Sequence, residues 1–308
     1  MTERPLEEHW TPPGSQPYDL RRSIGVLRRG PYDPAFGTDP DGTLWRATRT
    51  PRGPATLRLR QDHAPDRTVR AAAWGPGAAW VLERLPALLG GEDDPSGFVP
   101  RHRVVAESWR RNQGLRLIRT GQVMEVLVPC VLEQRVTTED AHRSWRLLLR
   151  RFGEPAPGAP QLYVPPDART LVRVPSWEWH RAGVDGKRSA AIVRAARVAR
   201  RMEEAAAMDL PAAVARLCAI DGIGPWTAAE TLQRSNGAPD AVTVGDLHLP
   251  GLIGYALTGE RGADDARMLE LLEPYAGQRH RAARLILLSG VAPARRAPRQ
   301  RHARIARL

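Results

Sequence analysis

The segment from residue 217 to residue 250 constrains the fold of this chain more than any other. It begins LCAIDGIGPWTAAE, which predicts two short helices joined by a glycine-containing hairpin. Gly222 and Gly224 can adopt positive φ angles and let the backbone come close to another molecule, and Pro225 suits the first turn of the second helix. Amide groups exposed at such a helix start bind anions. The segment therefore predicts a hairpin that holds a phosphate of DNA.

A single carboxylate, Asp246, follows Gly224 by 22 residues and stands just before a predicted helix at 247–257. Aspartate is a favoured N-cap, so a plain capping role is one interpretation. Capping and the helix dipole also favour the ionised carboxylate, which can stabilise positive charge that develops on a sugar. Because the hairpin would hold the neighbouring phosphate, we expect Asp246 to be a catalytic carboxylate that acts on a nucleoside within DNA.

The charge of the chain favours a polyanionic partner. The 308 residues carry a net charge of +12; residues 1–100 are balanced, so the excess falls on residues 101–308, which include the hairpin. Two cysteines cannot build a four-cysteine iron–sulfur or zinc site, and the histidines show no metal-binding spacing. The amino terminus shows no signal peptide, and no stretch predicts a membrane span. We expect a cytoplasmic, nucleoid-associated monomer without a metal.

Composition and periodicity divide the chain into four parts. Residues 1–17, rich in proline and charge, are predicted to be a flexible lead, and residues 18–100 a small α+β domain. Residues 101–290 are predicted to be all-helical, with a loop at 155–166, and residues 291–308 to be a basic tail. The predicted fold class is thus α+β, with a small antiparallel-sheet domain ahead of an all-helical domain. Strands are expected at 43–50 and 55–61, and helices at 78–89, 104–111, 122–134, 138–152, 189–207, 212–218, 225–234, 247–257, 264–272 and 281–288.

Two side chains near the start of the second hairpin helix are candidates for a base pocket. Trp226 and Glu230 are one turn apart and therefore share a face of the helix. Core packing is the ordinary role of such a tryptophan. A stacking wall for a base rotated out of the duplex is the functional interpretation, and Glu230 would add negative charge that suits a cationic base. We predict that both residues border the pocket.

These motifs resemble the helix-hairpin-helix superfamily of base-excision DNA glycosylases, and in particular its bacterial alkylpurine branch, 3-methyladenine DNA glycosylase II. The resemblance covers residues 18–290, and it rests on 217–229, on 244–250 and on the sequence VLEQRVT at 131–137. It implies that Asp246 is the catalytic carboxylate. It also implies two sets of DNA contacts: a phosphate-binding hairpin of Gly222, Ile223, Gly224 and Thr227, and a wedge into the duplex from Gln134 or Arg135.

The resemblance further implies a monofunctional hydrolase. Trp226 occupies the position where lyase-active members carry a Schiff-base lysine, and the single lysine, Lys187, lies outside both motifs. A monovalent cation bound by hairpin carbonyls is implied as well. Two departures from the family stand out: Asp221 replaces the usual proline and adds negative charge near a phosphate, and Glu230 replaces an aromatic pocket residue.

The sequence thus predicts a monofunctional glycosylase that flips alkylated purines of the 3-methyladenine type out of damaged double-stranded DNA and excises them, in base excision repair. Two alternatives stay open. A glycosylase for oxidised, deaminated or mismatched bases would need hydrogen bonds to the edge of a neutral base. A non-catalytic helix-hairpin-helix protein would bind DNA without forming abasic sites.

Overall fold

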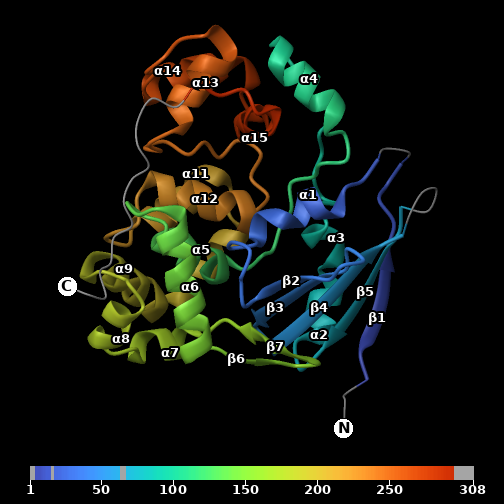
Figure 1. Cartoon of the computed structure of the whole chain (residues 1–308), viewed down its shortest axis with the longest axis vertical. Helices are drawn as coiled ribbons and strands as arrows, with labels where there is room; N and C mark the ends of the chain where they lie inside the picture. The colour runs from blue at the N-terminus through green and yellow to red at the C-terminus, as the bar shows by residue number, and fades with distance from the viewer. Residues whose placement is uncertain (1–3, 15–16, 63–66, 295–308) are drawn as a thin grey trace.

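A computed structural model describes residues 4–14, 17–62 and 67–294 and combines antiparallel strands with many helices (Figure 1). This arrangement confirms the predicted α+β class. The strands are β1 (Leu6–Trp10), β2 (Phe36–Thr38), β3 (Leu44–Thr50), β4 (Gly53–Gln61), β5 (Val69–Trp74), β6 (Glu154–Ala156) and β7 (Ala159–Val164). The helices are α1 (Leu20–Ile24), α2 (Ala78–Glu83), α3 (Leu85–Leu88), α4 (Arg103–Arg111), α5 (Val123–Leu132), α6 (Thr138–Phe152), α7 (Ala168–Arg173), α8 (Ser176–Arg181), α9 (Gly186–Arg197), α10 (Ala199–Glu203), α11 (Leu210–Cys218), α12 (Pro225–Ser235), α13 (Leu249–Thr258), α14 (Asp265–Leu272) and α15 (Arg279–Ser289), with 3₁₀ turns η1 (Gly25–Leu27), η2 (Glu204–Ala207) and η3 (Glu273–Tyr275).

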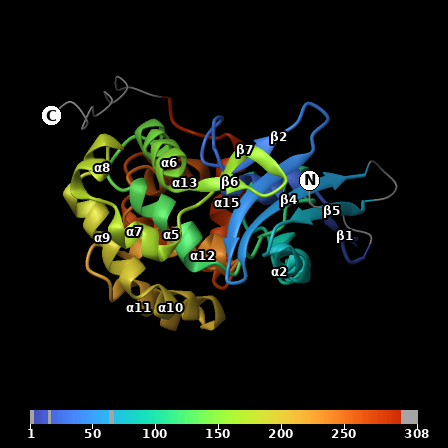
Figure 2. The same cartoon turned by 90° about the horizontal axis from the view of Figure 1, so that it is seen from below.

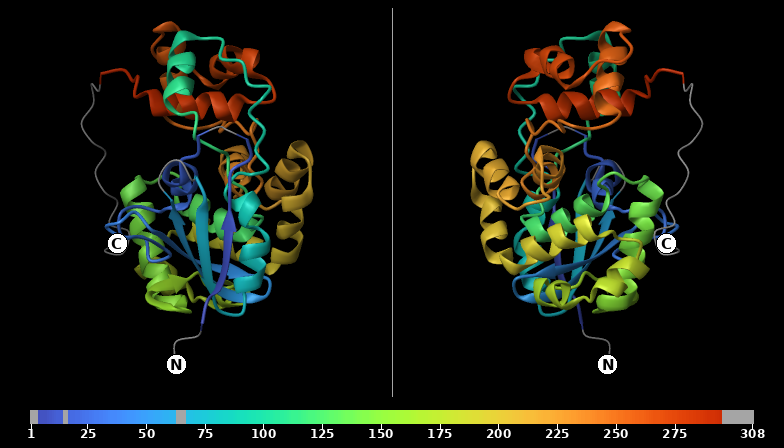
Figure 3. Two further views of the ribbon diagram at one scale, coloured as in Figure 1. Left: turned by 90° about the vertical axis from the view of Figure 1, so that its right-hand side faces the viewer. Right: turned by 90° about the vertical axis from the view of Figure 1, so that its left-hand side faces the viewer.

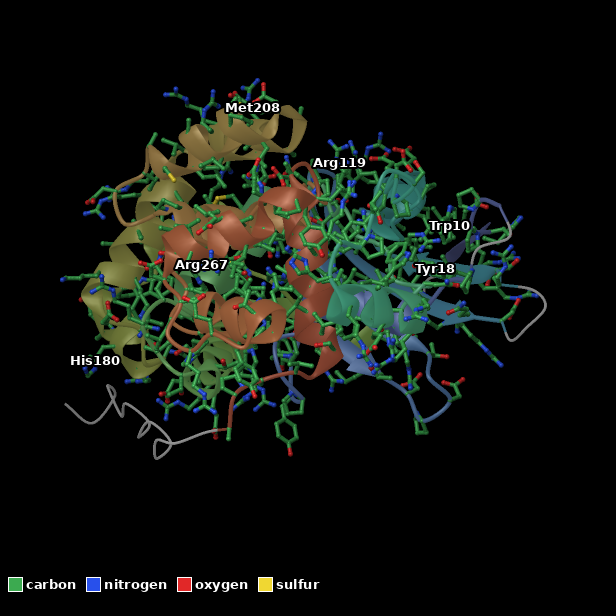
Figure 4. The ribbon with its side chains drawn as sticks, turned by 90° about the horizontal axis from the view of Figure 1, so that it is seen from above. Trp10, Tyr18, Arg119, His180, Met208 and Arg267 are labelled. Carbon is green, nitrogen blue, oxygen red and sulfur yellow. The ribbon has the colours of Figure 1, made fainter. Side chains whose placement is uncertain are left out.

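The first of three bodies is the five-stranded sheet, in which the strands follow the order β1-β5-β4-β3-β2 and all pairs are antiparallel. Apolar residues of β3, β4 and β5 form a core with α1, α2 and α3. Trp10 and Tyr18 pack edge to face at the rim of this sheet, with ring centroids 5.0 Å apart, and Figure 4 shows them side by side.

The other two bodies are helical. Helices α5 to α12 surround one core that includes Val131, Trp145 and Ile223. Helices α13, α14 and α15 pack with α4 around a separate core and lie at the far end of the molecule from α7 and α8 (Figures 1 and 3). Seen from below, most of the helices occupy one side and the sheet the other, with α2 beside the sheet (Figure 2). None of the helices in the described part of the chain is long and apolar enough to cross a membrane.

Two segments differ from the expectations. Residues 1–17 were predicted to be a flexible lead, yet β1 pairs with β5 along its whole length. Four of the five β1 residues are exposed, so this edge strand shows no apolar alternation that a sequence could reveal. Residues 155–166, predicted as a loop in an all-helical domain, contain the β6–β7 hairpin, whose apolar residues pack against Ala47 of β3. The predicted tail at 291–308 falls outside the described residues from position 295 onward.

Candidate active site

The hairpin between α11 and α12 needs one of its two glycines for its own geometry. Gly222 has a φ of +93°, and a Cβ there would lie 2.8 Å from the Cβ of Ala191. Gly224 has extended backbone, and a Cβ there would meet no atom of the chain within 4 Å. Ile223 is buried in the core of α5 to α12. Gly222 and Ile223 therefore fix the hairpin, whereas the space beside Gly224 is open to another molecule.

Gln134, which follows the end of α5, forms hydrogen bonds to the hairpin. Its Nε2 donates to the carbonyl of Gly222 at 3.0 Å and to the Oγ1 of Thr227 at 2.7 Å. Thr227 is itself buried. The amide of Gln134 thus contacts the hairpin, and the hydroxyl of Thr227 accepts from it. The wedge role of Gln134 and the phosphate contact of Thr227 stay predictions.

Arg135, the other candidate for the wedge, has a different environment. Its side chain is exposed, and at φ +54° it is the single non-glycine residue with positive φ among those described. Such a conformation is costly for a long side chain, and it is often associated with functional turns. Of the two predicted wedge residues, Arg135 is the one whose side chain has no hydrogen bond or ion pair to any residue that the structure describes.

Asp221 brings a negative charge to the hairpin, and Arg194 of α9 offsets it. The Nη1 of Arg194 lies 3.1 Å from the Oδ2 of Asp221 and donates to its backbone carbonyl, also at 3.1 Å. The carbonyls of Asp221 and Gly222 thus accept from Arg194 and Gln134. Each of these two carbonyls thus already has one donor within the protein, and the described residues contain no cluster of His, Cys, Asp and Glu that could hold a metal.

Asp246 stands at the entrance to α13 and accepts three hydrogen bonds. The indole Nε1 of Trp226 donates to its Oδ2 at 2.9 Å. The backbone amides of His248 and Leu249 donate to its Oδ1, each at 2.8 Å. Asp246 therefore caps α13 with one carboxylate oxygen while the second is aimed by the tryptophan that starts α12.

These donors keep Asp246 ionised. Burial alone would raise the pKa of its carboxyl, but the indole N–H of Trp226 and the amides of His248 and Leu249 outweigh burial, so the pKa lies below the ordinary value of 3.8. An ionised carboxylate held by fixed donors, with no lysine or arginine within ion-pair distance in the described chain, can stabilise positive charge on a substrate without first being freed from a salt bridge.

Asp246 lies in the wall of a cavity of about 160 Å³. The space far exceeds the roughly 30 Å³ that one water occupies in the liquid, so a ring-sized group can enter. Trp226 is not among the residues of the wall, and its indole Nε1 donates to Asp246. Its stacking role stays a prediction. The wall consists of residues from α12, α13, α15 and the segment before α13: Glu230, Gln233, Ala241, Val242, Thr243, Asp246, His248, Leu249, Leu252, His280, Ala283, Arg284 and Leu287.

Glu230 lies in this wall, but its charge is already balanced. Its Oε2 accepts from the Nη1 of Arg234 at 2.7 Å, and its Oε1 accepts from the hydroxyl of Thr243 at 3.0 Å. Burial alone would lower the pKa of Arg234, but the carboxylate of Glu230 outweighs it and raises that pKa. Both side chains are only 17% exposed, so the pair is weakly screened and its partners stay together.

Solved structures with a similar fold are DNA glycosylases. A 3-methyladenine DNA glycosylase from Archaeoglobus fulgidus has a TM-score of 0.73 and 16% identity over 92% of this chain and 96% of that chain. The 8-oxoguanine glycosylase/lyase of Clostridium acetobutylicum, in complex with DNA containing cytosine opposite 8-oxoguanine, has a TM-score of 0.71 and 10% identity over 94% of this chain and 98% of that chain. MBOgg1 in complex with a low-affinity DNA ligand has a TM-score of 0.71 and 15% identity, with the same coverage.

This chain has the fold of the helix-hairpin-helix DNA glycosylases. No protein-family model matches its sequence, and no curated protein sequence matches it significantly. Within the shared glycosylase fold, the structures of similar shape are named for an alkylated purine in one case and for an oxidised purine in another. The fold therefore leaves the class of base to be argued from the residues of the cavity.

Sequence reasoning missed the part of the wall that α15 contributes. Arg284 and Leu287 belong to the helix predicted at 281–288, and His280 lies just before its predicted start, but none was proposed as a site residue. His280 and Arg284 are four residues apart, which places them on one helix face, and that spacing was the available signal. It could not show which face points into the cavity, because the packing of α15 against α13 and α4 decides this.

Proposed function

We propose that this protein is a monofunctional DNA glycosylase that binds damaged double-stranded DNA, rotates one nucleotide out of the stack and hydrolyses its glycosidic bond. The observation that carries the proposal is Asp246, a carboxylate kept ionised by three hydrogen-bond donors in the wall of a cavity large enough for a ring. The glycine-containing hairpin, which we propose holds a phosphate, precedes Asp246 in the chain. It leads into α12, the helix that carries Trp226.

The chemistry follows from this placement. When the bond between the sugar C1′ and the base nitrogen breaks, its electron pair leaves with the base and positive charge builds on the sugar. Ionised Asp246 stabilises that charge, as a carboxylate does in glycoside hydrolysis. A water molecule then forms the new bond to C1′ and gives up a proton. The products are the free base and an abasic site in an otherwise intact strand.

DNA is held, in this proposal, mainly by its backbone. The amides at the start of α12 and the open side of Gly224 would receive a phosphate, and Arg135 would enter the gap that the flipped nucleotide leaves. Such contacts position the duplex without reading its sequence. Unstacking a nucleotide costs a few kcal/mol, less when the base is damaged or mispaired, so these contacts and the cavity must offset that cost.

The absence of strand cleavage is part of the proposal. A lyase step requires an amine that attacks C1′, and the position expected for such a lysine holds Trp226, whose indole is bonded to Asp246. Lys187, the one lysine of the chain, is exposed on α9. We expect intact abasic DNA as the product and no covalent protein–DNA adduct after borohydride treatment. An adduct that disappears in Lys187→Ala would contradict this assignment.

Two classes of base remain candidates for the cavity. The sequence resemblance favours alkylated purines of the 3-methyladenine type, which are cationic and leave readily. The charges of the wall favour a neutral damaged base, because the carboxylate of Glu230 is paired with Arg234 while Arg284 places a positive charge in the wall. A neutral base is therefore the second candidate.

The decisive experiment replaces Asp246. Asp246→Asn retains much of the cap but removes the charge, so we expect base release to fall at least about a hundredfold, the scale for losing one preorganised electrostatic group. Single-turnover release from duplexes with different damaged bases, revealed by alkali cleavage of abasic sites, measures this. Asp264→Asn, which alters the N-cap of α14, is the matched control. Equal rates for wild type and Asp246→Asn would contradict the proposal.

A further inference from the structure

The described wall of the cavity contains one arginine, Arg284, and the two arginines near it, Arg234 and Arg281, have carboxylate partners. Arg234 pairs with Glu230 at 2.7 Å. Arg281 is fully buried and pairs with the nearly fully buried Asp93. Each of these two cations is thereby balanced within the protein. In both pairs the arginine therefore has a structural role, because an unpaired buried charge is costly.

Arg284 differs from the other two. It lies in the cavity wall and is partly buried, yet among the described residues it forms no ion pair, and its one hydrogen bond runs from Nη2 to the backbone carbonyl of Arg22, at 2.8 Å. Burial, followed by the nearby cations Arg234 and Arg281, lowers the pKa of Arg284 to about 10, so it still carries its charge at neutral pH. A planar fork of donors is thus left without an acceptor inside the wall.

Apart from Asp246, which faces the sugar in the proposed mechanism, the described wall provides no unpaired carboxylate for a cationic guest. The carboxylate of Glu230 accepts from Arg234 and Thr243, so its charge is already balanced. His280, one helical turn before Arg284, is neutral, because burial and the cations Arg284, Arg234 and Arg281 hold its pKa well below the usual range. A positively charged base in this cavity would therefore face the positive charge of Arg284.

We infer that the cavity accepts a neutral damaged purine whose edge offers hydrogen-bond acceptors, and that Arg284 is the residue that recognises this edge. Arginine pairs in bidentate fashion with the O6 and N7 acceptors of a guanine-type edge, which hypoxanthine presents and which 7-methylguanine lacks at N7. The inference rests on the proposed glycosylase activity and names its substrate class.

The chemistry of the leaving group points the same way. A cationic alkylated purine departs as a neutral molecule, whereas a neutral base acquires negative charge as it takes the electron pair of the C1′–N bond. Arg284 would donate hydrogen bonds to that developing charge, and the base then takes up a proton from water. Fixed donors aimed at developing charge accelerate such a step, and this gives the unpaired guanidinium a use that offsets the cost of burying it.

The test compares two bases and four proteins. Single-turnover base release is measured from matched duplexes with hypoxanthine or 7-methylguanine, each corrected for spontaneous loss, for wild type, Arg284→Gln, Arg284→Lys and Arg70→Gln. Arg70 of β5 forms an ion pair with Asp62 in the sheet and controls for the loss of one positive charge. Arg284→Lys keeps the charge but lacks the planar fork. Thermal unfolding of every variant shows that it is folded.

We expect wild type to prefer hypoxanthine, and Arg284→Gln to reduce its release roughly tenfold to a hundredfold, the discrimination that one bidentate arginine contact supplies, with release of 7-methylguanine unchanged or faster. Arg284→Lys should fall between, and Arg70→Gln should match wild type. A wild-type preference for 7-methylguanine, or an equal loss on both bases as expected for a phosphate contact, would overturn this inference alone. Wild-type protein that releases no damaged base from any duplex would overturn the proposed function as well.

Discussion

The start of α13 and the middle of α12 each contribute one carboxylate to the same cavity, and the two are used differently. Asp246 is held by an indole and two backbone amides, none of which carries a full charge. Glu230 is held by the guanidinium of Arg234 and the hydroxyl of Thr243. Neutral donors keep a carboxylate ionised and leave its charge to act on a substrate, whereas a cationic partner cancels that charge. The comparison teaches that pairing, and not position in a motif, decides which carboxylate is available for catalysis.

The largest effect that separates the two regions is expected in stability. Glu230→Gln leaves Arg234 without a charged partner, and we expect the free energy of unfolding to fall by about 2 kcal/mol, below the roughly 3–5 kcal/mol for a fully buried pair because water still reaches these side chains. Urea unfolding measures this. Glu270→Gln, which removes an exposed pair with Arg267, should change stability by less than about 0.5 kcal/mol.

Unchanged stability in Glu230→Gln would break the comparison, because it would mean that the carboxylate is free to meet a cationic base. Base release provides the second readout. On protein that remains folded, Glu230→Gln should retain most of its rate, in contrast to Asp246→Asn. A loss in Glu230→Gln as large as that in Asp246→Asn would show that both carboxylates take part in the reaction.

A smaller effect is expected from Trp226, which donates to Asp246. Trp226→Phe removes the indole N–H, so the rate of base release at neutral pH should fall about tenfold, the scale of one hydrogen bond to a charged group. The pH profile sharpens this. The reaction needs ionised Asp246, whose pKa is lowered, so activity is present above that pKa and is lost as pH falls through it.

Losing the donor raises the pKa of Asp246, so the acid limb of the profile should move to higher pH in Trp226→Phe. Single-turnover rates from acid to neutral pH, corrected for spontaneous depurination, measure the shift. Trp177→Phe, at an exposed position of α8, is the control and should leave the profile in place. An acid limb that stays put in Trp226→Phe would show that the indole does not tune Asp246.

The clearest separation of folding from binding is expected at the hairpin glycines, where Gly224→Val should give the smallest change in stability. Gly222→Val should destabilise the fold by about 1–2 kcal/mol, because a side chain there combines positive φ with contact to Ala191. Gly224→Val should change stability by less than about 0.5 kcal/mol, yet weaken binding to damaged and undamaged duplex alike, because the new side chain fills the space left for the phosphate.

Unfolding curves and fluorescence anisotropy at one fixed salt concentration measure these two properties. Equal affinity of wild type and Gly224→Val for plain duplex would show that the hairpin does not hold a phosphate. The two glycines would then differ only in their effect on stability, because the fold requires glycine at position 222 and not at position 224. Such an outcome would also remove the reason to place a flipped nucleotide between the hairpin and Asp246.

Much of the architecture was predictable because it depends on local patterns. The cap at Thr137 accepts from the amide of Asp140 and begins the predicted helix at 138–152 with the same bounds. Strands β3 and β4 begin within two residues of their predicted starts and end where predicted. Edge strand β1 was not predicted because only one of its five residues is partly buried. The β6–β7 hairpin was not predicted because prolines interrupt its pattern.

By itself the sequence determined the local parts of the site: a hairpin whose glycines allow a positive φ, which Gly222 takes, and an aspartate that caps the next helix. Those features depend on residues that are neighbours in the chain. Only the tertiary structure decided the charge balance of the cavity. Glu230 and Arg234 are one helical turn apart, so their pairing follows from sequence spacing. That Arg284 has no carboxylate partner among the described residues depends on how α15 packs between α4 and α13. Distances across separate helices are set by packing rather than by sequence spacing.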